Sequence, residues 1–310
     1  MFMPVTASQR TLKAPIHCTG IGMHTGAKAA LTLRPAPVNT GILFRRLDGK
    51  NGPVEIPAHW SNAVESALCT TLTDGKNTTI LTIEHVMSAL AGSGIDNCVV
   101  ELIGPEAPVM DGSSAPFVFL IECAGIIEQA APRQAIKVLK PILVGDDRAW
   151  ASLEPDDLFS VEFEIDFASK AIGRQTASFT LDPFCYKHHI AKARTFGLLK
   201  DVESMRAAGR GLGGSLDNAV VIDGDRVMNE EGLRYTDEFV RHKVLDAVGD
   251  LYLAGAPLLG RFRGMRSSHA LNRRLLAALF ADADAWMMTL VDTAGSALEL
   301  WPEPARALSA

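Results

Sequence analysis

A stripe of apolar residues between positions 82 and 90 repeats with the period of an α-helix. It recurs at i, i+3, i+4 and i+7, through Ile83, Val86, Met87 and Leu90. Thr82 is the predicted N-cap, and glycines follow the last turn. Glu84 and His85 occupy the opposite face. That face is either an ordinary solvated surface or a place where two reactive side chains are presented together.

A second amphipathic helix is predicted from 236 to 250, with Thr236 as its N-cap. Its apolar stripe consists of Val240, Val244, Ala247, Val248 and Leu251. His242 and Asp246 are four residues apart and therefore share one face, and Asp250 continues that row. The pair is either a surface ion pair or part of a metal site.

A third helix is predicted to begin after Ser267 or Ser268 and to run through Phe280. His269 then lies in its first turn, the usual place of a surface or capping histidine. A helix N-terminus disfavours the imidazolium form, so a catalytic acid here needs a carboxylate such as Asp250 to hold its proton.

Short strands, irregularly interspersed with these helices, are predicted on both sides of a segment without hydrophobic period, 129–133. This arrangement favours an α+β fold over a doubly wound parallel sheet. We take the segment as a linker between a first domain, 1–128, and a second domain, 133–310. The predicted strands are 29–33, 41–45, 97–103, 135–139, 159–167 and 219–222.

Composition and charge limit the classes of protein to which the chain can belong. The 310 residues are 47% hydrophobic and 21% charged, which suggests about two globular domains. A net charge of -6 argues against a nucleic-acid partner. Residues 1–13 lack the apolar core of a secretory signal, and no run approaches the ~20 apolar residues that span a bilayer, so we expect no transmembrane segment and a cytoplasmic protein. The five cysteines form no Cys-x-x-Cys pair.

His85, His242 and Asp246 together supply two imidazoles and one carboxylate, a ligand set of catalytic zinc sites. Mn²⁺ or Fe²⁺ accepts the same donors, so the residue types leave the metal open. Glu84 adjoins a proposed ligand and is placed to accept a proton from the attacking water.

Several segments resemble the UDP-3-O-acyl-N-acetylglucosamine deacetylases, the zinc-dependent family of lipid A synthesis in Gram-negative bacteria. They follow the family's order over nearly the whole chain. The matching segments are 20–26 (GIGMHTG), 82–85 (TIEH), 89–97 (ALAGSGIDN), 110–117 (MDGSSAPF), 193–197 (ARTFG), 213–217 (GGSLD), 237–243 (DEFVRHK), 245–246 (LD) and 268–272 (SHALN).

The resemblance implies two similar α+β domains, each layering a sheet with helices, and an active site between them. It implies Zn²⁺ on His85, His242 and Asp246, with Glu84 as general base. His269 then protonates the leaving amine, oriented by Asp250. The resemblance further implies that Lys243 and Thr195 stabilise the oxyanion.

The implied substrate is a small UDP-linked, acylated amino sugar, and no nucleic-acid partner is expected. The sequence leaves the oligomeric state open, with a monomer as one possibility. Residues 197–226 resemble the family's insert that shelters the acyl chain. Passage-lining positions fall on Met23, Leu199, Val202, Leu216 and Val221, which would fit an ordinary core equally well. Lys243 and Arg148 are the candidate diphosphate contacts, and Phe196 the candidate to pack against the sugar or uracil.

Two alternatives remain open on the sequence. A zinc peptidase or general amidohydrolase would be expected to carry a His-Glu-x-x-His helix, and none occurs in the sequence. A non-catalytic binder of sugar nucleotides would use the same histidines structurally, without holding metal.

Overall fold

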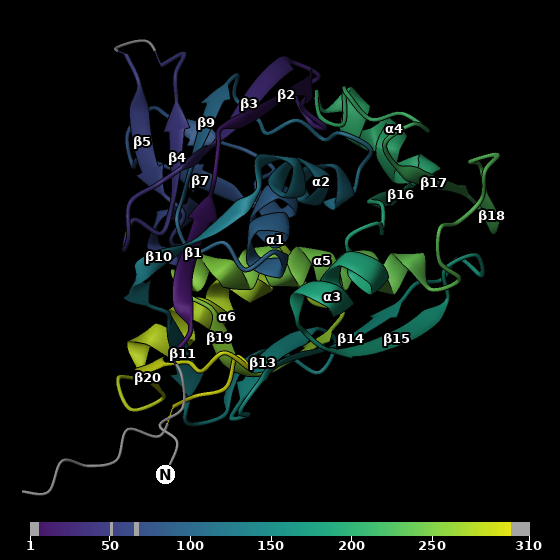
Figure 1. Ribbon diagram of the computed structural model, residues 1–310. Coiled ribbons are helices and arrows are strands. Elements are labelled where there is room, and N and C mark those ends of the chain that lie inside the picture. The colour runs from purple at the N-terminus through teal and green to yellow at the C-terminus, as the bar shows by residue number, and fades with distance from the viewer. Residues whose placement is uncertain (1–5, 50–51, 65–67, 299–310) are drawn as a thin grey trace, which may run out of the picture.

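Two mixed sheets enclose a central layer of helices in the computed structural model, which describes residues 6–49, 52–64 and 68–298 (Figure 1). The sheet of the first half has the strand order β2-β3-β9-β4-β5. Its strands are β2 (Ile16–Ile21), β3 (Lys28–Pro35), β9 (Cys98–Ile103), β4 (Ile42–Arg46) and β5 (Val54–Pro57). All neighbours are antiparallel except β4 and β9, which run parallel.

The sheet of the second half repeats this pattern. Here β12 pairs with β13, β13 with β19, and β14 with β15, all antiparallel, whereas β14 and β19 are parallel. The same sheet also contains β11 and β20. Its strands are β11 (Gln134–Val138), β12 (Ile142–Gly145), β13 (Trp150–Glu154), β14 (Phe159–Asp166), β15 (Arg174–Thr180), β19 (Leu258–Met265) and β20 (Trp286–Leu290).

The correspondence extends to the helices. In each half, the segment that joins the two parallel strands contains a buried helix before the second of these strands. This helix is α1 (Glu84–Gly92) in the first half and α5 (Glu238–Leu251) in the second. A further helix comes after that strand, α2 (Ala115–Ala124) in the first half and α6 (His269–Ala281) in the second. The pair β1 (Ser8–Leu12) and β10 (Ile126–Pro132) corresponds to β11 and β20. The fold is therefore α+β, as the sequence pattern predicted, and built from two similar halves, as the family resemblance implied.

Each half carries a three-stranded insertion before its central helix. In the first half this is β6 (Ala63–Val64), β7 (Thr71–Thr73) and β8 (Thr79–Ile80). In the second half it follows a short helix, α3 (Pro183–Cys185), and consists of β16 (Phe196–Leu198), β17 (Val220–Asp223) and β18 (Arg226–Val227), with α4 (Leu199–Ala207) after β16. In Figure 1, β16, β17, β18 and α4 project to one side of the central helices.

The helices α1 and α5 pack against each other at the centre of the molecule (Figure 1). On α1 every residue from Glu84 to Leu90 is buried, so the helix has no solvated face. Its buried Ser88 donates to the Leu245 carbonyl of α5 across 2.7 Å. Of the two interpretations of the Glu84–His85 face, the solvated surface is therefore wrong.

Strand positions were predicted well, and the helix starts less well. Each of the six predicted strands overlaps an observed one. Thr82 is not the N-cap of α1: it has a positive φ of 56°, and Ile83 precedes the first turn. Asp237, rather than Thr236, precedes α5, whereas Ser268 caps α6 by accepting from the Leu271 amide, as predicted.

The proposed linker 129–133 is not irregular: residues up to Pro132 belong to β10, which pairs with β1. The side chains of β10 are all exposed or half-buried and alternate only weakly, so the sequence shows no clear hydrophobic period. The boundaries 1–128 and 133–310 therefore remain a proposal. Among the described residues no helix is long and apolar enough to cross a bilayer. Residues 1–5 of the segment examined for a signal lie outside the described residues.

Candidate active site and metal centre

The three predicted metal ligands meet between the two halves. One potential ligand atom from each of His85, His242 and Asp246 lies within 4.8 Å of the others, and all three side chains are buried. The Nε2 atom of His242 lies 3.3 Å from Asp246 Oδ1, and Nε2 of His85 lies 3.7 Å from the same oxygen. The imidazole rings of the two histidines meet edge to face with centroids 5.1 Å apart.

The donor set fits a bound divalent cation. Within the described part of the chain Asp246 Oδ1 is buried and has no hydrogen-bond donor, although two ring nitrogens face it. A buried oxygen left in this way is costly unless a cation or donor completes it. His242 Nδ1 lies 3.1 Å from the carbonyl of Ala193, which orients Nε2 toward the cluster.

Shifted pKa values keep the three side chains in the protonation states that can bind a cation. Burial lowers the pKa of His85 to about 3 and also lowers that of His242, so both imidazoles are neutral near pH 7. Burial alone would raise the pKa of Asp246, but His242 and Lys243 outweigh it and hold the pKa below its usual value. The site therefore offers two neutral nitrogens and one carboxylate.

Glu84 lies beside this cluster at the start of α1. Its Oε2 accepts a hydrogen bond from the Thr70 amide at 3.0 Å, and its Oε1 lies 3.9 Å from His269 Nε2. Burial raises the pKa of Glu84 well above its ordinary value, which makes the carboxylate a stronger proton acceptor. Cys69, buried one residue before Thr70, contributes to the electrostatics of this carboxyl group.

His269 faces the same point from the first turn of α6. Its Nδ1 lies 2.8 Å from Asp250 Oδ2, and its Nε2 lies 4.0 Å from Asp246 Oδ2. Burial alone would lower the pKa of His269, but the carboxylates of Asp250 and Glu84 raise it to about 10. The ring is therefore charged at neutral pH, with Nε2 directed into the site.

Asp250 is itself fixed by neighbours. Asn272 Nδ2 donates to its Oδ2 at 2.8 Å, and the hydroxyl of Thr70 donates to its Oδ1. Asn272 in turn accepts from Ser267 at 2.8 Å. The residues that orient His269 thus come from α5, from α6 and from the strand region of the first half.

Lys243 and Thr195 flank the cluster. The Nζ of Lys243 donates to Asp246 Oδ2 at 2.7 Å, and the carboxylate of Asp246 raises the pKa of Lys243 against the effect of burial. Thr195 lines the cavity in front of the ligands and is held by its amide, which donates to the carbonyl of Gly112 at 2.8 Å. Whether either group contacts an oxyanion stays a prediction.

A cavity of about 330 Å³ opens in front of these residues. Glu84, His85, His242, Asp246 and His269 belong to its polar lining. The rest is mainly apolar and is formed by the insertion of the second half together with the loop after β2. All five residues predicted to line an acyl passage contribute to it, namely Met23, Leu199, Val202, Leu216 and Val221.

Two predicted substrate contacts have other surroundings. Arg148 lies in the turn between β12 and β13, where its amide donates to Asp146, and it is not among the residues that line the cavity. Phe196 lines the cavity, and its ring also packs edge to face against Phe239 and against His242, a predicted metal ligand, with centroids 5.0 and 6.2 Å away. Phe196 therefore helps to hold the imidazole of His242 in position. The proposed contacts of both residues with substrate stay predictions.

Glu106 is a site-building residue that sequence reasoning missed. Its buried carboxylate accepts from the amides of His24 and Thr25 and from the hydroxyls of Thr25 and Thr82, all at 2.7–2.9 Å. It thereby ties the segment 22–26 to Thr82, two residues before α1. Gly22 is required there, because a Cβ would lie 2.3 Å from Glu106 Oε2. The glycines of segment 20–26 are the feature of the sequence that could have indicated this close packing.

Comparison with known proteins agrees with this geometry. The family model for LpxC, UDP-3-O-acyl N-acetylglycosamine deacetylase, matches residues 9–281. A UDP-3-O-acyl-N-acetylglucosamine deacetylase from Acidithiobacillus ferrooxidans is 53% identical over 280 residues, which cover 90% of this chain and 91% of the relative. Proteins of the same name from Stenotrophomonas maltophilia and Pseudomonas entomophila are 51% and 47% identical and cover 92% and 97% of this chain, and 94% and 99% of their own. The chain therefore belongs to the UDP-3-O-acyl-N-acetylglucosamine deacetylase family of enzymes.

Proposed function

We propose that this enzyme uses zinc to hydrolyse the acetamide of UDP-3-O-(3-hydroxyacyl)-N-acetylglucosamine, releasing acetate and a free amine in the committed step of lipid A synthesis. The observation that carries the proposal is the convergence of His85 and the His242–Asp246 pair on one point, with Glu84 and His269 facing it. Family membership supports the choice of substrate.

In the proposal, His85, His242 and Asp246 hold the zinc ion. When bound there, zinc would act as a Lewis acid toward the acetamide carbonyl and would lower the pKa of water. The donors also suit Mn²⁺ and Fe²⁺, and we propose zinc because two imidazoles and one carboxylate are a common catalytic zinc set.

Glu84 serves as the general base of the proposed reaction. Its Oε2 is anchored by the Thr70 amide, so Oε1 is the oxygen left to accept a proton from the attacking water. The raised pKa of Glu84 strengthens that role. Proton transfer by a positioned side chain contributes typically about 10²–10⁴-fold to rate.

His269 serves as the general acid. Its proton on Nε2 is available to the leaving nitrogen, because Asp250 engages Nδ1 on the other side of the ring. Two titratable groups with opposite tasks thus stand across the site, with their nearest atoms 3.9 Å apart. Lys243 and Thr195 would neutralise the charge that develops on the carbonyl oxygen of the acetamide.

The apolar part of the cavity would take the acyl chain. Each methylene removed from water there contributes about 0.8 kcal/mol of binding. Polar and apolar residues line one and the same cavity, which suits a substrate with a reactive amide and an attached alkyl chain. The cytoplasmic location expected from the sequence remains part of this proposal.

Acetate release from the UDP-linked substrate, with and without a strong chelator, tests the function. We expect release that stops on chelation and returns when zinc is added back. Release that is unaffected by complete metal removal would contradict the metal-dependent proposal. Binding of the substrate without any release would favour the non-catalytic sugar-nucleotide binder.

A further inference from the structure

A buried ion pair lies close to one of the proposed metal ligands. The guanidinium of Arg194 meets the carboxylate of Glu238 in two hydrogen bonds, from Nε to Oε1 at 2.9 Å and from Nη2 to Oε2 at 3.2 Å. The two side chains are 2% and 0% exposed. Glu238 begins α5, one turn before His242. Neither member of the pair enters the proposed reaction, so the pair needs an explanation of its own.

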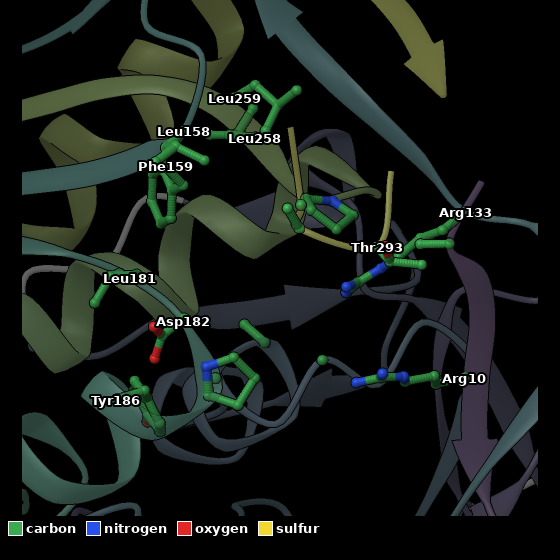
Figure 2. A pocket seen from close by; sticks show the side chains of 18 of the residues that line it. Arg10, Arg133, Leu158, Phe159, Leu181, Asp182, Tyr186, Leu258, Leu259 and Thr293 are labelled. Carbon is green, nitrogen blue, oxygen red and sulfur yellow. The ribbon is translucent and has the colours of Figure 1, made fainter. Parts of the chain in front are cut away.

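Solvent reaches the other arginines that the structure describes. Figure 2 shows Arg10 and Arg133 beside a cavity of about 540 Å³, where their side chains are 38% and 20% exposed and pair with Glu128 and Asp96. Among the described residues Arg194 is the only buried arginine or lysine. A wholly buried ion pair is weak evidence for added stability, because removal of both charges from water offsets their attraction. What the pair holds in place is therefore the feature to explain.

The pair also binds the backbone of the segment that contains Arg194. Glu238 Oε1 accepts from the Arg194 amide at 2.9 Å, so one oxygen holds both the main chain and the side chain of this residue. Residues 193–195 belong to no helix or strand, so tertiary contacts must fix their conformation. The Gly232 carbonyl accepts from Arg194 Nη2 at 2.7 Å, and the Arg234 amide donates to Glu238 Oε2 at 2.6 Å. The pair thus fastens segment 193–195 and the loop before α5 to the first turn of that helix.

The residues on both sides of Arg194 belong to the candidate site. The carbonyl of Ala193 lies 3.1 Å from Nδ1 of His242 and so orients Nε2 toward the cluster. Thr195 lines the reaction cavity. A shift of the Arg194 backbone would therefore move the carbonyl that orients a proposed ligand and the side chain proposed to face the oxyanion.

We propose that Arg194 and Glu238 are positioning residues of the metal centre. Their pair fixes segment 193–195 against α5, and the Ala193 carbonyl then keeps the imidazole of His242 turned with Nε2 toward the cluster. Neither residue of the pair belongs to that cluster or lines the reaction cavity. The inference rests on the proposed function, which assigns His242 as a metal ligand.

The zinc dissociation constant of the full chain, measured by competition with a chelator, tests this inference. Glu238→Gln removes the negative charge and turns one acceptor oxygen into a donor. It should weaken zinc binding about tenfold or more, since loss of the groups that orient a ligand typically costs about 10–100-fold in metal affinity.

Glu231→Gln is the matched control. Glu231 accepts from Nη1 of the same guanidinium at 2.6 Å, but its side chain is 59% exposed, and it is Glu238 that holds the Arg194 amide. The zinc dissociation constant of Glu231→Gln should stay within about twofold of the wild-type value, because an exposed ion pair contributes little.

Cobalt(II) bound in place of zinc gives a second readout, which a purely stabilising pair would not change. Its visible absorption depends on ligand geometry, so Glu238→Gln should alter the spectrum and Glu231→Gln should not. Arg194→Lys keeps the charge but cannot bond both Glu238 oxygens and the Gly232 carbonyl as the planar fork does, and it should also weaken zinc binding. It decides the question where Glu238→Gln lowers the folded fraction.

Thermal unfolding of the metal-free proteins measures stability separately. A lower Tm in Glu238→Gln, with a zinc dissociation constant equal to that of the wild type, would make the pair a stabilising contact only and overturn the inference. Equal losses of zinc affinity in Glu238→Gln and Glu231→Gln would overturn it as well. Wild-type protein that binds no zinc would instead contradict the proposed function itself.

Discussion

Gly249 of α5 lies directly against the backbone of Glu84 of α1. A Cβ at Gly249 would stand 2.1 Å from the Glu84 carbonyl oxygen and 3.0 Å from the Ser88 amide nitrogen. Real Cβ atoms do not approach backbone so closely, so the two helices pack at this distance only because residue 249 has no side chain. The contact sets the spacing between Glu84, the proposed general base, and the helix that carries two of the proposed metal ligands.

Gly249→Ala should therefore destabilise the protein and separate the two helices. Overpacking a core costs about 1–3 kcal/mol, and each kcal/mol lowers Tm by roughly 2–4 °C in large domains. Thermal unfolding measures the effect. Gly197→Ala is the control, because a Cβ there meets only a Val202 methyl, at 3.3 Å. Equal Tm values for the two variants would contradict the close-packing argument.

Glu84→Ala should retain bound metal and lose about 10²–10⁴-fold in turnover, since it removes the proposed proton acceptor but no ligand. Metal content and acetate release are measured on the same preparation. Full activity in this variant would remove Glu84 from the mechanism. Loss of metal together with activity would instead make Glu84 a structural support of the ligands.

The charge of His269 should depend on Asp250. In metal-stripped protein the His269 ring is expected to titrate with a pKa of about 10, and Asp250→Asn should lower that pKa because a raising carboxylate is removed. NMR of the labelled imidazole follows the titration. Because the pKa of His269 in the folded protein lies above its ordinary value of 6.5, protonation of the ring stabilises the fold. This contribution is fully present at pH values below 6.5 and is lost as the pH rises through about 10. An unchanged pKa in Asp250→Asn would refute the coupling.

Leu216→Asp should weaken use of the acylated substrate. Leu216 lines the apolar part of the reaction cavity and is 42% exposed, so the change is compatible with folding. Loss of a leucine contact costs about 1.5–3 kcal/mol, which is roughly tenfold or more in KM. Leu212→Asp is the control, since Leu212 is 52% exposed and does not line that cavity. Similar KM values for both variants would argue against an acyl passage there.

The sequence predicted what local patterns encode. Helical periods located the central helices. The i, i+4 spacing of His242 and Asp246 predicted that their side chains lie together on one helix face, and Nε2 of His242 lies 3.3 Å from Asp246 Oδ1. Prediction failed where distant residues decide local geometry. Thr82 resembles an N-cap, but Glu106, 24 residues later, binds its hydroxyl while its backbone takes a positive φ.

Burial of polar residues was the hardest feature to infer. A Glu–His pair opposite an apolar stripe is usually solvated, yet α5 covers that face of α1. The pairing of β10 with β1 likewise depends on residues more than a hundred positions apart, so the segment 129–133 resembled a linker. The repeated strand pairing of the two halves is visible only in three dimensions, because no identity marks it in the sequence.

Metal content per chain after dialysis tests the central claim most directly, namely that one ion is shared by ligands from both halves. Mass spectrometry of the wild-type protein should find one zinc per chain. The His85→Ala variant should contain essentially no zinc, although His242 and Asp246 remain in place on α5. One tightly held zinc in His85→Ala, or none in the wild type reconstituted with zinc, would contradict the shared metal centre.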